Sequence, residues 1–244
     1  MTIECNRLLD NLFRFDVQHS DFRITCSPSP ALLRSAFQLR ADVFCRELGW
    51  VGTPESELEV DSFDADVVHL CVEQDSRAVA YLRIHPWWSK WMLRTVFSSA
   101  LPANYAGGGP SSCEVSRLAV APSFRSSSRG CDTSPTVLLY SYLSAFCDLN
   151  GYATVEMIVS DRVLRSLRQS GLPCVGYSTP NKPAYADAPV YASLRWQELL
   201  APTRPSSSKL AIACSNALRR VMRSHATSDQ SHDTTEPRAE VRAS

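Results

Sequence analysis

Two apolar segments separated by a short polar turn constrain the fold of this chain more than any other feature. Residues 67–73 and 78–85 are largely apolar, and Gln74, Asp75 and Ser76 separate them. Such runs joined by a few turn residues are typical of a β-hairpin, so we expect two adjacent antiparallel strands. Arg83 lies inside the second strand, where an unpaired charge would be costly, so we also expect a carboxylate partner for it.

Strand-like and helix-like segments alternate through the rest of the chain. Apolar runs typical of strands occupy residues 22–26, 112–121, 153–159, 174–177 and 189–194. Capped, amphipathic or buried runs typical of helices occupy residues 31–48, 137–149 and 161–169. This order favours an α/β (α+β) fold, a three-layer α-β-α sandwich.

The length of 244 residues suits one sizeable domain with appendages. We expect the domain to span residues 1–200 and the remainder, residues 201–244, to be an appendage. In the appendage we predict a linker at 202–208, a basic helix at 209–223 and a disordered tail after about residue 226.

Composition narrows the class of protein. The 25 basic and 25 acidic residues balance, which does not indicate a nucleic-acid-binding protein. Charged residues at 7, 10, 14 and 16 interrupt any signal-peptide core, and no apolar run is long enough for stable membrane insertion. The nine cysteines are odd in number and form no CxxC pair or metal-ligand spacing, so we expect reduced thiols, no metal site and a cytoplasmic protein.

Arginines, carboxylates and aromatic residues are gathered between residues 40 and 117. Arg40 and Phe44 are four residues apart and therefore share a face of the predicted helix. The other members of this set are Trp50, Asp61, Asp64, Arg83, Phe97, Glu114, Ser116 and Arg117. Taken singly, several of them have an ordinary explanation: Phe44 as core, Trp50 as a surface anchor, and Asp61 and Asp64 as solvated or capping carboxylates.

The order and spacing of this set resemble the acyl-homoserine lactone synthases, the autoinducer synthase family of quorum sensing. The resemblance covers residues 20–195 and implies a fold similar to the acetyltransferase superfamily. It also implies that S-adenosylmethionine is acylated from acyl carrier protein and then lactonised, with release of methylthioadenosine. These two are substrates, and no cofactor is implied.

The resemblance implies that Glu114, Ser116 and Arg117 are catalytic. Glu114 suits a general base for the substrate amine, and Ser116 or backbone N–H groups suit the oxyanion. In a regular strand Arg117 points to the face opposite Glu114 and Ser116. We therefore expect the strand to be bulged or splayed here, as it is in the family.

The remaining residues divide between the two substrates. On the S-adenosylmethionine side we expect Arg40, Phe44, Trp50, Asp61, Asp64 and Arg83, and on the acyl and pantetheine side Phe97, Met157, Val159 and Ser160. Three arginines, at 40, 83 and 117, balance the carboxylates at 61, 64 and 114, so the charges can be buried together. The alternative is that these six merely form ion pairs that fasten the N-terminal part to the sheet.

A basic stripe follows the last of these residues. Arg162, Arg165 and Arg168 are three apart on a predicted helix and could dock an acidic carrier protein, although a solvated basic face is as good an explanation. Only Arg129 and Gly130 match the glycine-rich pyrophosphate loop of acetyltransferases, which argues against a conventional coenzyme A site.

Two other functions compete with the synthase. An N-acyl amino acid synthase of similar fold would acylate an amine without forming a lactone, and a catalytically silent module would only bind acyl carrier protein or S-adenosylmethionine. Glu114 with Arg117 argues against the silent module. Trp50 with Asp61 and Asp64 favours the lactone synthase over the amino acid synthase.

Overall fold

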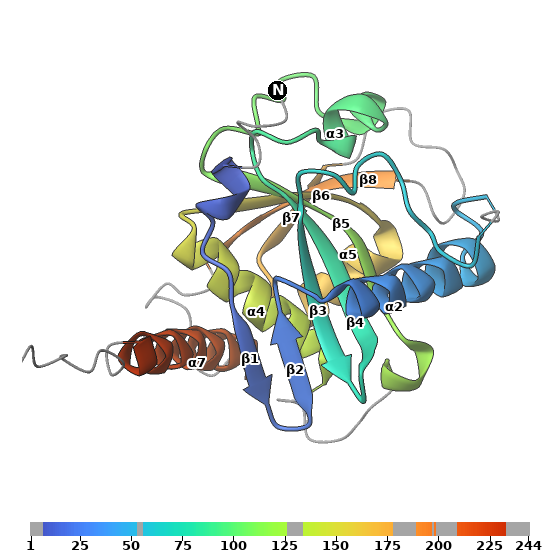
Figure 1. The fold of residues 1–244 in the computed structure, drawn as a ribbon. Helices are drawn as coiled ribbons and strands as arrows, with labels where there is room; N and C mark the ends of the chain where they lie inside the picture. The colour runs from blue at the N-terminus through green and yellow to red at the C-terminus, as the bar shows by residue number, and fades with distance from the viewer. Residues whose placement is uncertain are drawn as a thin grey trace, which may run out of the picture.

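The computed structural model describes residues 7–52, 56–125, 134–177, 189–196, 198 and 209–232. Its centre is an eight-stranded sheet in the order β1-β2-β3-β4-β5-β6-β8-β7, with helices on both faces (Figure 1). The strands are β1 (Asp16–His19), β2 (Phe22–Thr25), β3 (Val68–Gln74), β4 (Arg77–His85), β5 (Ser112–Val120), β6 (Thr154–Ser160), β7 (Cys174–Tyr177) and β8 (Pro189–Arg195). The predicted three-layer sandwich is confirmed.

The predicted hairpin is confirmed as β3 and β4, which pair antiparallel along their length. Asp75 and Ser76 form its turn with φ angles of 51° and 62°, the left-handed pair that suits the twist of a two-residue hairpin. All neighbouring strands are antiparallel except β5 and β6, which are parallel.

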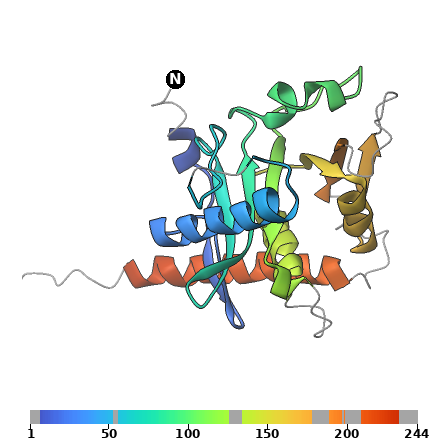
Figure 2. The same cartoon turned by 90° about the vertical axis from the view of Figure 1, so that its right-hand side faces the viewer.

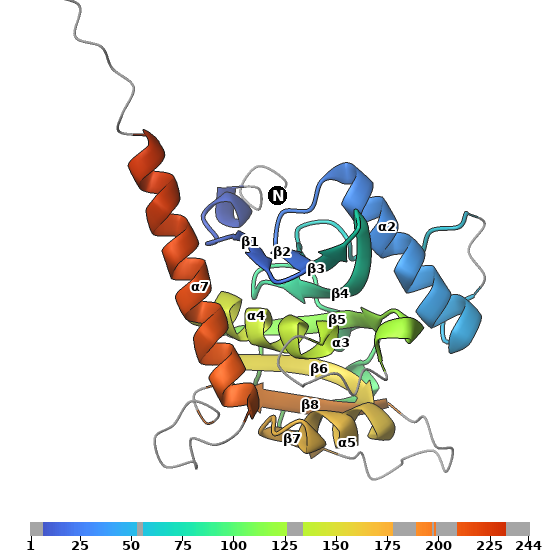
Figure 3. The same ribbon diagram turned by 90° about the horizontal axis from the view of Figure 1, so that it is seen from below.

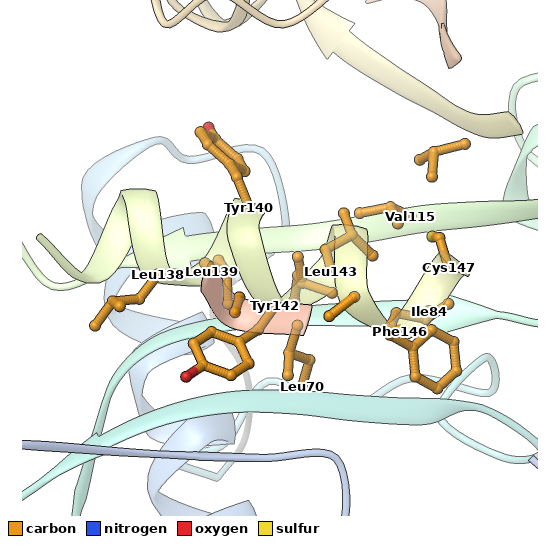
Figure 4. Packing of buried hydrophobic residues seen from close by; sticks show 14 of the residues in the cluster. Leu70, Ile84, Val115, Leu138, Leu139, Tyr140, Tyr142, Leu143, Phe146 and Cys147 are labelled. Carbon is orange, nitrogen blue, oxygen red and sulfur yellow. The ribbon is translucent and has the colours of Figure 1, made fainter. Parts of the chain in front are cut away.

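Alternation along the strands distributes side chains between two helical layers. Leu70 of β3 and Ile84 of β4 point to the face covered by α4 (Pro135–Leu149), whose Leu139, Leu143 and Phe146 pack with them in one core (Figure 4). On the other face, α2 (Pro30–Arg40) packs on Cys71, Tyr81 and Ala119.

Serine caps begin the three main helices of the sandwich. Ser29, Ser134 and Ser160 each accept a hydrogen bond from a backbone N–H three residues later, at α2, α4 and α5 (Asp161–Gln169). The predicted helix over 31–48 is confirmed in extent, but its second half is not α-helical. It becomes a π-helix, η1 (Ala41–Glu47), in which the N–H of Leu48 donates to the carbonyl of Val43. The wider turn rotates its side chains so that both Val43 and Phe44 are buried against the sheet.

The C-terminal helix α7 (Lys209–His232) is longer than predicted and continues past residue 226, where disorder was expected. Its buried Leu210, Cys214, Ala217 and Val221 recur at helical spacing and join the core that contains α4. Figures 2 and 3 show α7 running beside α4 toward β1. No helix in the described ranges has the length and apolarity to cross a membrane.

Some predictions concern segments that the structure does not describe. The linker at 202–208, Arg129 with Gly130, and the chain beyond residue 232 lie outside the described residues. Strand β1, by contrast, is described and was not predicted. Its four residues are too few for the alternation of apolar and polar side chains to be recognised beside a leucine-rich segment.

Candidate active site

A cavity opens where β5 and β6 separate. The two strands are paired only from Ser112 to Glu114 and from Thr154 to Glu156 in the described sheet, and they diverge beyond these residues. The cavity has a volume of about 410 Å³. Its lining includes eight of the predicted site residues: Phe44, Trp50, Phe97, Glu114, Ser116, Arg117, Val159 and Ser160. The predicted splay is therefore confirmed.

Arg117 has an unusual backbone conformation at this point. Its φ is 54°, in the left-handed region, and the register between β4 and β5 shifts between Tyr81 and Arg83 on the neighbouring strand. This irregularity frees Arg117 from strict alternation, as the sequence required. Its Nη2 consequently reaches Glu59 Oε1 at 2.9 Å and Asp61 Oδ2 at 2.8 Å.

Arg40 and Arg83 complete a buried ion-pair network and are themselves 0% exposed. Arg40 Nη1 donates to Asp64 Oδ1 at 2.6 Å. Arg83 Nη1 donates to Asp61 Oδ1 at 2.6 Å and to Asp64 Oδ1 at 2.7 Å, which confirms the expected carboxylate partner. Since each guanidinium meets carboxylates directly, the network can stay charged while buried.

The network holds a residue that the sequence reasoning missed. Glu59 is 3% exposed, pairs with Arg40, and accepts from Arg117 on the same carboxylate. It takes the position that the charge balance had assigned to Glu114. The one sequence signal for the burial of Glu59 was its position between the apolar residues Leu58 and Val60. That signal is weak, because residues 57 and 61 are acidic as well.

The aspartates of this network are held ionised. Burial raises the pKa of Asp61, but hydrogen bonding and charge from Arg83, together with Arg117, outweigh it and lower the pKa below its ordinary value. For Asp64 burial is likewise outweighed, here by Arg40 and Arg83. The network therefore offers a substrate fixed charges of both signs at neutral pH.

Glu114 lies outside the network, in a different environment. It is 2% exposed, and its Oε1 accepts from the backbone N–H of Leu93 at 3.2 Å, in helix α3 (Met92–Thr95). Its Oε2 has no hydrogen-bond partner among the described residues. Burial raises the pKa of Glu114 to about 8, against the smaller lowering effects of the Leu93 and Met92 N–H groups and of Arg83. It is thus a carboxyl group with an available oxygen and a pKa near neutrality, which suits a general base.

Ser116 is engaged on both sides, by Arg83 and His85. Arg83 Nε donates to its hydroxyl at 3.0 Å, and His85 Nε2 lies 2.9 Å from the same oxygen. His85 Nδ1 contacts the Lys90 carbonyl at 3.1 Å, which can only accept, so Nδ1 carries the proton and Nε2 accepts from Ser116. Burial and Arg83 lower the pKa of His85 to about 3, so the ring stays neutral. The hydroxyl proton of Ser116 is therefore committed to His85 and is not free for an oxyanion, contrary to one of the roles expected from the sequence.

Two aromatic residues border the cavity beside the network. The Phe44 and Trp50 ring centroids are 6.2 Å apart, and the Arg117 guanidinium lies 5.5 Å from the Phe44 centroid. Phe44 is buried, whereas Trp50 is 48% exposed at the cavity edge. An aromatic pair in this position can offer ring faces to a cationic or planar ligand.

The predicted acyl-side and docking residues are only partly gathered here. Phe97, Val159 and Ser160 line the cavity, but Met157 is buried in the core shared with α4 and is not among the lining residues that the structure describes. The basic stripe of α5, Arg162, Arg165 and Arg168, is exposed and begins directly after Ser160. Arg168 also donates to the carbonyl of Cys174 at 3.0 Å.

Comparison with known proteins identifies the family of this chain. Residues 39–130 match the family model described as an acetyltransferase (GNAT) domain. The probable acyl-homoserine-lactone synthase of Sinorhizobium fredii is 31% identical over 146 residues, 58% of this chain and 70% of that protein. The acyl-homoserine-lactone synthase of Vibrio anguillarum is 28% identical over 145 residues, 57% and 73% of the two chains.

Two solved structures share the fold. The coenzyme A-dependent acyl-homoserine lactone synthase BjaI, with SAM and isopentyl-CoA, has a TM-score of 0.60 at 23% identity over 76% of this chain and 82% of its own. The synthase LasI has a TM-score of 0.61 at 21% identity over 76% and 91%. The fold, the relatives and the matched domain define an acyltransferase. More narrowly, the chain belongs to the acyl-homoserine-lactone synthase family.

Proposed function

We propose that this enzyme transfers an acyl chain from the thioester of acyl carrier protein to the amine of S-adenosylmethionine and then closes a homoserine lactone. The observation that carries the proposal is Glu114, a buried carboxyl group that lines the cavity beside a network of fixed charges and has one oxygen without a partner among the described residues. The relative BjaI, whose structure contains SAM and isopentyl-CoA, supports S-adenosylmethionine and an acyl thioester as the two substrates, without deciding the carrier of the thioester.

Acyl transfer begins with removal of a proton from the substrate ammonium, because the protonated form has no lone pair. Glu114 Oε2 takes this proton, and its pKa of about 8 makes it a stronger base than a solvated carboxylate. The free amine then attacks the thioester carbonyl. As the tetrahedral intermediate collapses, the C–S bond breaks, the nitrogen loses its extra proton to give the amide, and the leaving thiolate takes up that proton.

Charge on the tetrahedral oxygen needs donors near the reacting carbon. The Ser116 hydroxyl already donates to His85, so we assign this role to backbone N–H groups beyond Glu114, on the edge of β5 that faces the cavity. Preorganised backbone donors of this kind are an effective means of stabilising an oxyanion.

Lactone closure is an intramolecular displacement. The carboxylate oxygen of the acylated substrate forms a bond to the carbon that carries the sulfonium, the C–S bond breaks, and neutral methylthioadenosine leaves. Since the leaving group is already activated by its charge, holding the two ends together is the main requirement. We propose that Arg40, Arg83 and the aspartates orient the methionyl part, while the rings of Phe44 and Trp50 face the sulfonium or adenine.

The donor is proposed as acyl carrier protein because the exposed stripe Arg162, Arg165 and Arg168 starts beside the cavity-lining Ser160. Coenzyme A is the second candidate, since BjaI is described as coenzyme A-dependent. Both donors are consistent with the cytoplasmic location expected from the sequence. The alternative product, an N-acyl amino acid, would form if lactone closure did not follow.

Purified enzyme, S-adenosylmethionine and matched acyl thioesters of the two donors test the proposal. Mass spectrometry should detect the homoserine-lactone fragment ion. The kcat/KM should be higher for the carrier-protein thioester than for the coenzyme A thioester. Acyl amino acids alone would reject lactone formation, and a higher kcat/KM for the coenzyme A thioester would reject the donor. Arg162→Glu should raise the KM for the carrier protein, whereas Arg219→Glu, an exposed change on α7, serves as the matched control.

A further inference from the structure

A second buried carboxyl group lies beside Glu114. Glu156 of β6 is its register partner in the parallel pair of β5 and β6, so the two side chains leave the same face of the sheet. Both residues are 2% exposed. Neither forms an ion pair among the described residues, which makes this carboxyl pair different from the arginine-paired aspartates nearby.

Hydrogen-bond donors, not cations, compensate Glu156. Its Oε2 accepts from the Tyr105 hydroxyl at 2.6 Å and from the Tyr191 hydroxyl at 3.2 Å, while its Oε1 accepts from the Gly108 N–H at 2.9 Å. Three donors converging on one carboxylate hold it in a single orientation. They also fasten residues 105–108 against β6.

The glycines of this segment are required by the close approach of its backbone. A Cβ at Gly107 would lie 2.6 Å from Glu156 Oε2 and 2.7 Å from Oε1, whereas a Cβ at Gly109 would meet nothing within 4 Å. Glu156 is therefore packed against main chain, and the segment can close over it only because residue 107 lacks a side chain.

The same segment is tied to the helix that contacts Glu114. Arg94 of α3 donates to the Gly108 carbonyl at 2.7 Å, and its guanidinium lies 4.5 Å from the Trp91 ring centroid. Leu93, the preceding residue, supplies the N–H that donates to Glu114. Glu156 is thus the neighbour of Glu114 across the strands and is also connected to it through Gly108, Arg94 and Leu93.

We propose that Glu156 is a positioning residue for acyl transfer, which sets the environment of Glu114 as its neighbouring buried carboxylate and fixes the α3 turn that hydrogen-bonds it. This inference rests on the proposed role of Glu114 as the base. The charged or titratable groups near Glu114 are Arg83 from β4, the register partner of Glu114 on the same strand, His85, which is neutral, and Glu156 from β6. Helix α3 presents the backbone N–H groups of Met92 and Leu93. Of these, Glu156 acts with burial to raise the pKa of Glu114, whereas Arg83 and the two N–H groups lower it.

Glu156→Gln removes the charge with little change in shape. In the full chain with ¹³C-labelled glutamate carboxyl groups, the Glu114 resonance is identified by its loss in Glu114→Gln. We expect its titration midpoint to fall by about one pH unit in Glu156→Gln, as removal of a neighbouring like charge requires. The acidic limb of kcat/KM against pH should move down with it. A midpoint and limb that match the wild type would overturn the proposal, even if Glu156→Gln melts at a lower temperature.

The paired glycine variants test the positional part if Glu156→Gln does not fold. Gly107→Ala displaces the segment from Glu156, and we expect kcat to fall by about tenfold to a hundredfold. Gly109→Ala, which has open space, should retain wild-type kcat. Equal kcat in the two variants would overturn the proposal. The titration needs no substrate, so absence of lactone from wild-type enzyme would reject the proposed function separately.

Discussion

Glu59 and Arg117 are 58 residues apart in the sequence, and their side chains meet with Arg117 Nη2 donating to Glu59 Oε1 at 2.9 Å. Glu59 also pairs with Arg40, so one buried carboxylate joins an arginine of α2 to an arginine of β5. This contact joins the network to Arg117, which lines the cavity. It also fastens the segment after η1 to the sheet, so the predicted structural role of the ion pairs coexists with the proposed binding role.

Replacing Glu59 by glutamine should therefore destabilise the protein strongly. Fully buried Arg40 and partly buried Arg117 would lose a shared partner, and breaking a buried pair typically costs about 3–5 kcal/mol. Denaturant unfolding of Glu59→Gln and of Glu57→Gln, an exposed neighbour, measures the difference. A loss in Glu59→Gln no larger than in the control would show that the contact adds little.

Glu114→Gln should abolish acyl transfer and leave the fold intact. The change is nearly isosteric and removes the base, so we expect kcat/KM to fall by about 10²–10⁴-fold. Circular dichroism checks the fold and mass spectrometry the product. Turnover close to wild type would remove Glu114 from the mechanism.

The same variant makes a prediction about stability and pH. The folded pKa of Glu114, about 8, is above its ordinary value of 4.5, so the folded state binds the proton more tightly and wild-type stability falls as pH rises between these values. Glutamine does not titrate, so the free energy of unfolding of Glu114→Gln relative to wild type should increase from pH 5 to pH 8. A constant difference over this range would contradict the raised pKa.

Ser116→Ala distinguishes between two roles of Ser116, as a structural hydrogen-bonding residue and as an oxyanion donor. Loss of an oxyanion donor typically costs about 10²–10³-fold in kcat. Because the Ser116 hydroxyl donates to buried His85, we expect instead less than about a tenfold fall in kcat. The free energy of unfolding should fall by about 1–3 kcal/mol, because partners of the hydroxyl are left unsatisfied. A fall in kcat of a hundredfold at unchanged stability would restore the oxyanion role.

These residues show what the sequence could and could not predict. The hairpin and the partner of Arg83 were predictable, because strand alternation and the cost of a buried charge act locally. The identity of the third carboxylate was not, since Glu59 lies in a loop without periodicity. The role of Glu156 was not predictable for another reason. A single acid in an apolar strand indicates that the acid is buried, but its hydrogen-bond donors Tyr105, Gly108 and Tyr191 come from segments distant in the sequence.

Shortening α7 distinguishes its buried part from its end. A chain ending before Ala226 should keep nearly full activity, because the last buried apolar contact is Val221 among the described side chains of α7 and residues 225–227 are exposed. A chain ending before Lys209 should lose stability, because the side of α4 that packs on α7 would face water. Thermal unfolding and product formation of both truncations decide this. A large loss of activity in the longer chain would show that the end of the helix belongs to the enzyme.

Acyl selectivity gives the last prediction, a preference for chains without a 3-oxo group. In this family, members that make 3-oxo products tend to carry threonine where this chain has Met157. The threonine hydroxyl can donate a hydrogen bond to the oxo group, whereas the methionine thioether cannot. The structure adds a second reason. Ser116 lines the cavity, but its proton is engaged by His85, and most of the other lining residues around it are apolar, including Val115, Ile158 and Val159.

The side chain of Met157, in β6, is packed in the core. Met157→Thr therefore tests whether a hydroxyl at this position can reach the acyl chain, and Met157→Leu is the control for lost packing. Kinetics on carrier-protein thioesters of equal length, with and without the 3-oxo group, should show a higher kcat/KM for the unsubstituted chain in wild type. A clear preference of the wild type for the 3-oxo substrate would reject the prediction.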